Sequence, residues 1–151
     1  MPGNERIVGS SESGVMHRPW RVLLVDDDDD AREMCAESLG QFGYETLQAE
    51  HGAEAIETTL RRKPDLIVMD LEMPVMGGLE AIRRLRADAR TSAIPIIVLS
   101  ANGILDHAKA KNAGCDTCLV KPCAFDDLES VVRTMIEASR LEPVARDSVP
   151  G

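Results

Sequence analysis

Aromatic residues are scarce in this chain: one tryptophan, one tyrosine and two phenylalanines account for 3% of its 151 residues. The apolar share of 44% is nevertheless ordinary for a globular protein. The core must therefore be built from Leu, Ile, Val, Met and Ala. The length suits one domain whose buried core is large enough to be stable without disulfides or bound metals.

Basic residues are also few, with 17 Lys and Arg against 26 Asp and Glu and a net charge of −9. Binding to nucleic acid or to an anionic membrane surface would need a basic face, so both are disfavoured. No apolar run approaches the roughly 20 residues of a membrane span, and the first residues contain no stretch typical of a signal peptide. We therefore expect a cytoplasmic protein whose partners are neither nucleic acid nor membrane.

The four cysteines, at positions 35, 115, 118 and 123, are too few for a disulfide framework. Cys115 and Cys118 form a C-x-x-C pair, which occurs in redox sites and in zinc sites. No second pair follows at zinc spacing, and Cys123 would lie roughly 15 Å from Cys118 along a strand. We interpret the cysteines as small buried residues, with a redox pair as the alternative.

Five apolar runs alternate with five segments of helical periodicity, which predicts a parallel sheet covered by helices on both faces. The second run is less apolar and is expected near an edge. Residues 1–18 and 140–151 lack periodicity and are predicted to be tails, flexible at the N-terminus, around a domain at 19–139. The expected strands are 20–25, 44–49, 66–70, 95–99 and 117–120, and the expected helices are 31–42, 53–60, 79–85, 104–113 and 128–136.

Four of the five strands end in a charged or reactive side chain. Because the carboxyl ends of parallel strands lie at one edge of a sheet, we expect these side chains to meet. Three carboxylates in such a group repel one another unless a cation lies among them, and Mg²⁺ is the cation that prefers oxygen ligands. The strand ends are Asp26-Asp27, Asp70, Ser100 and Lys121.

These strand ends also suit phosphoryl chemistry. The Ser100 hydroxyl and the Lys121 ammonium would complete a cradle for a phosphoryl group, whose transfer needs mainly positioning and neutralisation of oxygen charge. Asp70 ends the most apolar strand and precedes a loop forced by Pro74 and by Gly77-Gly78. It would be the nucleophile, forming an acyl phosphate.

The ordered set of short motifs resembles the receiver domain of bacterial two-component response regulators. The resemblance implies a flavodoxin-like, doubly wound α/β fold with a five-stranded parallel sheet in the order 2-1-3-4-5 and five helices. Each motif alone is weak, but their order and spacing are specific. The matching residues are Val25-Asp26-Asp27, Asp70 with Met73-Pro74 and Gly78, Ser100-Ala101, and Lys121-Pro122.

The resemblance also implies roles for the site residues. Asp70 would accept a phosphoryl group from a sensor histidine kinase or a histidine phosphotransfer protein. Ser100 would bind a phosphoryl oxygen on activation, and Lys121 would pair with that oxygen. The peptide bond between Lys121 and Pro122 is expected to be cis, which aims the lysine into the site. The implied Mg²⁺ ligands are Asp27, Asp70 and the backbone carbonyl of Glu72, with Asp26 acting through water.

Two positions depart from the family pattern, because Cys118 and Cys123 stand where aromatic residues are usual. Cys118 has no ring to rotate when the phosphate arrives, so we expect an output that does not use aromatic rotation. The output is expected as phosphorylation-dependent partner binding or phosphorelay, with the partner on a face made by residues 104–113, 117–120 and 128–136. The sequence after residue 139 predicts no DNA-binding module, which leaves a stand-alone switch or a piece of a longer protein.

Two other functions are alternatives to this non-enzymatic switch. A Mg²⁺-dependent phosphatase of the haloacid-dehalogenase type would use Asp26 and Asp28 as its D-x-D motif. It would need Thr or Val where Asp30 stands, and an acidic pair directly after the lysine strand, where Lys121-Pro122-Cys123-Ala124 offers none. A receiver-like scaffold that takes no phosphate is the third possibility, disfavoured by the complete set of acid, hydroxyl and lysine residues.

Overall fold

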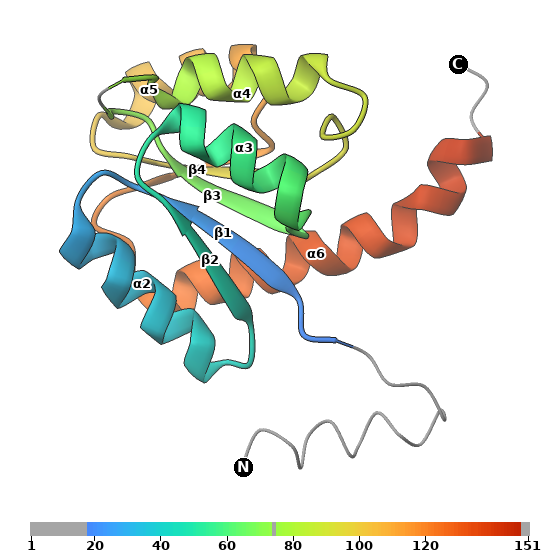
Figure 1. Ribbon diagram of the computed structural model, residues 1–151, viewed down its shortest axis with the longest axis horizontal. Helices are drawn as coiled ribbons and strands as arrows, with labels where there is room; N and C mark the ends of the chain where they lie inside the picture. The colour runs from blue at the N-terminus through green and yellow to red at the C-terminus, as the bar shows by residue number, and fades with distance from the viewer. Residues whose placement is uncertain (1–17, 74, 149–151) are drawn as a thin grey trace.

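The computed structural model describes residues 18–73 and 75–148, so the predicted tail at 1–18 lies almost wholly outside the described residues. Strands and helices alternate along these ranges (Figure 1). The strands are β1 (Arg21–Val25), β2 (Glu45–Ala49), β3 (Leu66–Asp70), β4 (Ile96–Ser100) and β5 (Thr117–Val120). The helices are α2 (Asp29–Gln41), α3 (Gly52–Arg62), α4 (Gly78–Ala87), α5 (Gly103–Ala113) and α6 (Phe125–Ser148).

The strands form one parallel sheet in the order β2-β1-β3-β4-β5, which confirms the flavodoxin-like fold and the edge position of β2. The strand order reverses between β1 and β3, where open α/β sheets bind ligands. Val25 pairs with Met69, so Asp26 and Asp70 follow side by side at this crevice. Ser100 pairs with Val120, which places Lys121 next to the end of β4.

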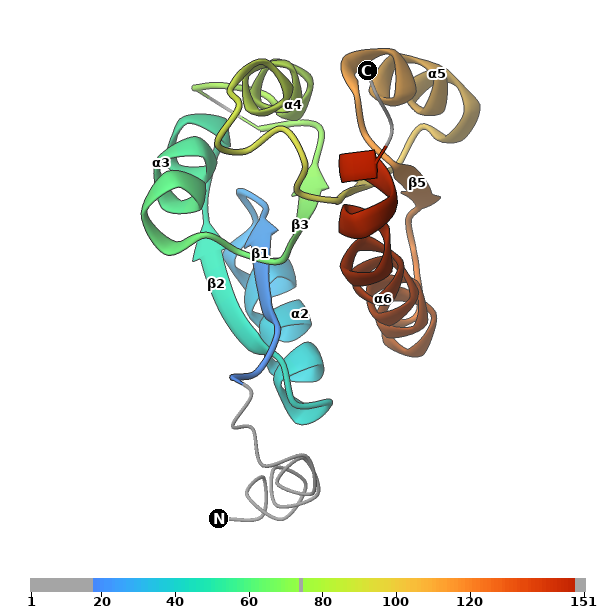
Figure 2. The same ribbon diagram turned by 90° about the vertical axis from the view of Figure 1, so that its right-hand side faces the viewer.

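The alternation of side chains along each strand divides the aliphatic core into two layers. Val22 and Leu24 point to the face covered by α2 and α6, whereas Leu23 and Val25 point to the face covered by α3, α4 and α5. Figures 1 and 2 show these two groups of helices on opposite sides of the sheet. All five residues of β3 are buried, as expected for a central strand between two helical layers.

Each helix differs from its predicted range at one or both ends, and α6 differs most. Helix α2 begins at Asp29 instead of Ala31, because the Asp28 side chain accepts hydrogen bonds from the backbone N–H groups of Asp30 and Ala31. Helix α6 continues to Ser148, well beyond the predicted helix end at residue 136, while the domain limits of 19–139 and the C-terminal tail from residue 140 stay predictions.

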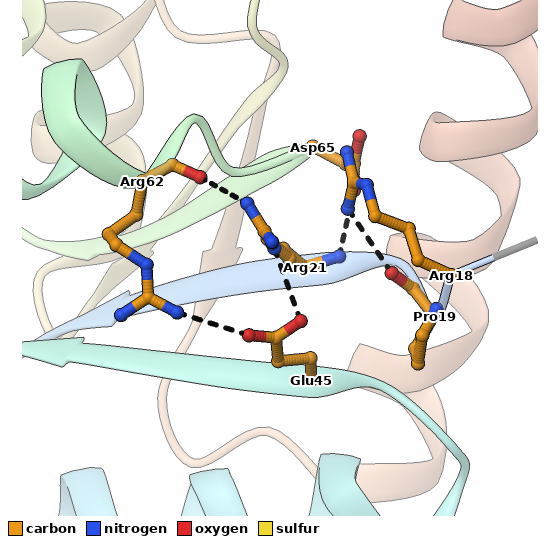
Figure 3. Close-up of polar contacts among 6 residues, drawn as sticks. All are labelled: Arg18, Pro19, Arg21, Glu45, Arg62 and Asp65. Atoms are coloured by element: carbon orange, nitrogen blue, oxygen red, sulfur yellow. Dashed lines mark hydrogen bonds and ion pairs between the residues drawn. The ribbon is translucent and has the colours of Figure 1, made fainter.

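A polar network ties the amino ends of the strands together, at the sheet edge away from the crevice (Figure 3). The Asp65 carboxylate accepts a 2.8 Å hydrogen bond from the backbone N–H of Arg21. The Glu45 carboxylate lies between two guanidinium groups, 3.1 Å from Arg21 and 3.2 Å from Arg62. These contacts hold β1 and β2 in register where the apolar core ends.

Among the helices described here, none is long and apolar enough to cross a bilayer.

Candidate functional site

The predicted acidic residues meet at the carboxyl ends of β1 and β3. One carboxylate oxygen from each of Asp26, Asp27 and Asp70 lies within 4.8 Å of the others. Asp70 is buried, Asp26 is half-buried and Asp27 is exposed, so the group faces solvent on one side. Asp28 caps α2 and its backbone N–H donates to Asp26 Oδ1 at 2.9 Å, which fixes the turn after β1.

Lys121 brings a positive charge to this group. Its Nζ donates to Asp70 Oδ1 at 2.8 Å and lies 3.9 Å from Asp26 Oδ2. The Lys121–Pro122 peptide is cis, as the family resemblance implied. Burial raises the pKa of Asp70, and the charges of Asp26 and Asp27 add to this, although the lysine opposes it. Burial alone would lower the pKa of Lys121, but the contact with Asp70 raises it.

Ser100 ends β4 and is buried, with 2% of its surface exposed. Its Oγ accepts a hydrogen bond from the backbone N–H of Asn102 at 3.0 Å. The same hydroxyl donates to Asp106 Oδ2 at 2.5 Å. Asp106 lies in the first turn of α5 and was missed by the sequence analysis, because α5 has too little apolar periodicity to show which of its faces is buried.

All the predicted site residues line one cavity of 220 Å³ at the sheet edge. The Glu72 side chain, which lines this cavity, accepts a 3.2 Å hydrogen bond from the side-chain amide of Asn102. Asp106 lines the cavity as well. The cavity thus combines Asp26, Asp27, Asp70, Glu72, Ser100 and Lys121 with one further carboxylate.

A buried arginine, also missed from the sequence, supports the turn after β1. The guanidinium of Arg32 donates to the backbone carbonyl of Asp26 at 2.7 Å, to Gln48 at 2.8 Å and to Asp29 at 2.7 Å. Asp29 is itself largely exposed, so this ion pair joins a solvated carboxylate to a buried guanidinium. An arginine inside an apparently polar helix gives no sequence signal of burial.

The donors of the acidic group fit magnesium. All three are carboxylate oxygens, which are the ligands that Mg²⁺ prefers, and the exposed side leaves room for waters and phosphate oxygens. In the part of the chain that the structure describes, this is the one group of three or more potential metal ligands, so the cysteines form no zinc site there.

The family model of the response regulator receiver domain matches residues 22–133. The chain belongs to the response regulator receiver domain family. Among solved structures, a response regulator from Chloroflexus aurantiacus is 32% identical with a TM-score of 0.76, covering 79% of this chain and 98% of that one. The receiver domain of a Pseudomonas aeruginosa sensor histidine kinase, with a magnesium ion coordinated in its active-site cleft, is 29% identical with a TM-score of 0.75 and the same coverage.

Curated relatives of this receiver domain are longer proteins. The phosphate regulon transcriptional regulatory protein PhoB of Pseudomonas aeruginosa is 40% identical over 131 residues, which are 86% of this chain and 53% of that protein. The response regulator MprA of Mycobacterium ulcerans is 37% identical over 85% of this chain and 56% of its own length. The chain therefore spans about half the length of the curated relatives it matches.

The four cysteines of the receiver domain are free thiols. Cys35 and Cys115 are buried as predicted, but Cys118 and Cys123 are only half-buried. Cys118 packs against the core under α3, α4 and α5, and Cys123 packs against the opposite core. Burial raises the pKa of all four thiols, to about 11 for Cys35 and Cys115. Such thiols are protonated at neutral pH, which disfavours a C-x-x-C redox pair.

Proposed function

We propose that this receiver domain accepts a phosphoryl group on Asp70 from a phosphohistidine and uses the modification as a signal. The observation that carries the proposal is the 2.8 Å contact of Lys121 Nζ with Asp70 Oδ1 inside a cavity lined by two further aspartates. A buried carboxylate beside one fixed ammonium is positioned for attack, and the same ammonium can neutralise an incoming phosphoryl oxygen.

The neighbouring residues divide the remaining tasks. We assign Asp26, Asp27, Asp70 and the Glu72 carbonyl to a Mg²⁺ site, and a bound Mg²⁺ would neutralise charge on the phosphoryl oxygens. The buried Ser100 hydroxyl is within the same cavity and can donate to a phosphoryl oxygen. Burial of Asp70 also limits the access of water that would hydrolyse an acyl phosphate.

We propose a protein as the downstream partner, docked on the face made by α5, β5 and α6. The large apolar residues exposed there support this choice, since Ile104, Leu105 and Val120 are 87%, 72% and 53% exposed. A net charge of −9 favours a protein surface over nucleic acid for these residues. The functions that the longer relatives carry in the rest of their sequence are not assigned to this chain.

The haloacid-dehalogenase alternative would need Asp28 as the second aspartate of its D-x-D motif, but in the structure Asp28 has another role. The Asp28 carboxylate accepts hydrogen bonds from the N–H groups of Asp30 and Ala31 as the cap of α2. It is therefore committed to the helix and is not directed at a substrate. A scaffold that takes no phosphate is separated from the proposed switch by direct labelling.

The test is incubation of the protein with acetyl phosphate and Mg²⁺, followed by intact mass and hydroxylamine treatment. We expect one added phosphate, removable by hydroxylamine, and its loss in Asp70→Asn. Asp126→Asn is the matched control, because Asp126 is an exposed aspartate in the first turn of α6. Full labelling of Asp70→Asn would refute Asp70 as the acceptor, and an unlabelled parent protein would support the scaffold.

A further inference from the structure

Asp106 is a buried carboxylate for which the proposed phosphoryl chemistry has no use. It is 9% exposed and accepts a hydrogen bond from the Ser100 hydroxyl at 2.5 Å. Within residues 18–73 and 75–148, no other hydrogen bond reaches the Asp106 side chain. A buried carboxylate that loses its last donor is costly, so the Ser100 hydroxyl holds Asp106 in place.

The Ser100 hydroxyl has only one proton to donate. Its lone pairs are partly occupied by the backbone N–H of Asn102, and its proton is given to Asp106. A phosphoryl group on Asp70 would introduce charged oxygens into the cavity that Asp70, Ser100 and Asp106 share. The hydroxyl can then satisfy the phosphoryl oxygen or Asp106, but not both.

We propose that Asp106 is the latch that couples phosphorylation to the output face, an inference that rests on the proposed phosphorylation of Asp70. When the Ser100 hydroxyl turns to the phosphoryl oxygen, Asp106 is left buried without a donor. The first turn of α5 then moves until the carboxylate reaches water. Asp106 is a positioning residue in this scheme, because it acts through Ser100 and does not touch the phosphoryl group.

The first turn of α5 is held loosely enough to respond. Its N-cap residue, Asn102, makes no side-chain capping bond, and Gly103 has a positive φ of 55°. Ile104 and Leu105 are among the most exposed apolar residues of the described chain, so little apolar packing resists movement. Because these two residues directly precede Asp106 in the same helical turn, moving the turn would reposition the apolar part of the proposed partner surface.

The residue at the usual switch position lies near this latch. Cys118 pairs with Val98 on β4 and packs against the core that α5 covers, and the charge of Asp106 adds to burial in raising the pKa of its thiol. The Cys118 side chain is too small to replace an aromatic ring that rotates between two positions. A carboxylate that must find a new hydrogen-bond donor can drive a helix turn without any ring.

The experiment compares the parent protein with Asp106→Ala by amide NMR, titrating beryllofluoride as the phosphate mimic in the presence of Mg²⁺. In the parent we expect the amides of residues 103–107 to shift on binding. In Asp106→Ala we expect a shift less than half as large and a half-saturating concentration about tenfold lower, since a hydrogen bond to a charged group no longer competes. Asp126→Ala removes an acidic residue from the first turn of α6 and should behave as the parent does.

Ser100→Ala provides an independent arm without any phosphate mimic. Removing the hydroxyl leaves Asp106 without its donor, so the amides at 103–107 should already be displaced in the free protein. An undisplaced first turn in Ser100→Ala would overturn the latch, as would equal shifts and equal half-saturation in Asp106→Ala and the parent. A parent protein that gains no mass with acetyl phosphate, while Ser100→Ala shows the displacement, would instead overturn the proposed phosphorylation.

Discussion

Two glycines in helices are expected to respond in opposite ways to the same substitution. A methyl group added at Gly78, the first residue of α4, would lie 2.5 Å from the Asp70 carbonyl oxygen and 2.9 Å from Leu71 Cα. At Gly40, near the end of α2, nothing lies within 4 Å of the added carbon. Gly78→Ala therefore pushes on the strand that holds Asp70, the proposed phosphoacceptor, whereas Gly40→Ala affects only the conformational freedom of the chain.

The magnitudes follow from these contacts. Overpacking against backbone costs about 1–3 kcal/mol, and Gly78→Ala is placed near the upper end because both neighbouring atoms belong to the main chain. Gly40→Ala should raise the free energy of unfolding by roughly 0.5–1 kcal/mol through helix propensity. The two variants should thus differ by about 2–4 kcal/mol, or roughly 5–12 °C in Tm for a domain of this size.

Urea unfolding of both variants beside the parent protein measures this difference, and acetyl phosphate labelling measures its effect on the site. Because the clash involves the carbonyl of Asp70 itself, Gly78→Ala should also label more slowly under conditions where it is fully folded. Gly40→Ala should label at the parent rate. If Gly78→Ala were as stable as Gly40→Ala, the close packing of α4 against the end of β3 would be refuted.

Three further predictions concern the metal, the switch position and the thiols. Millimolar Mg²⁺ should raise the Tm. Asp27→Asn should weaken this effect, yet it should raise the stability of the metal-free protein because it relieves carboxylate repulsion. A Tm that does not change with Mg²⁺ would count against the proposed metal site. Cys118→Tyr should enlarge the beryllofluoride-dependent amide shifts of α5 and β5, and a smaller change would show that the cysteine has a readout of its own. The pKa of Cys35, raised from 9.0 to about 11, favours the folded protein below pH 9, and this contribution should be lost as the pH rises through 11. Unfolding measured between pH 8 and pH 11 should therefore show a smaller loss of stability in Cys35→Ala, and an unchanged loss would contradict the burial of this thiol.

The strand ends could be predicted from the sequence because two simple rules operate on them. A run such as Leu66–Met69 is apolar on both faces only if helices cover both faces, which requires a parallel sheet. A parallel sheet then brings every strand end to one edge, whatever the separation along the chain. Asp26, Asp70, Ser100 and Lys121 could thus be grouped without knowledge of any loop, and the structure places them around one cavity.

Asp106 and Arg32 could not be predicted in this way, because each is buried by contacts that depend on local geometry. The position of Asp106 depends on the turn through Asn102 and Gly103, whose positive φ sets the direction of α5. Arg32 is buried because three acceptors from different segments happen to face its guanidinium. Polar residues in helices with weak apolar periodicity give no sequence signal of which side they face.

The proposed readout differs in kind from the proposed phosphoryl chemistry. Phosphoryl acceptance needs charged groups at fixed strand ends, which the parallel sheet supplies for any sequence with these residues. Transmission to α5 needs an element with two arrangements, and a rotating ring is one way to provide it. In this chain the half-buried Cys118 has no ring whose rotation could provide two arrangements. The Ser100–Asp106 hydrogen bond can provide them, because it is made or broken by a single proton donor. Coupling would then depend on competition for the Ser100 proton and not on the rotation of an aromatic side chain. Such coupling needs no aromatic residue at position 118, although the acid, hydroxyl and lysine residues of the site are all present.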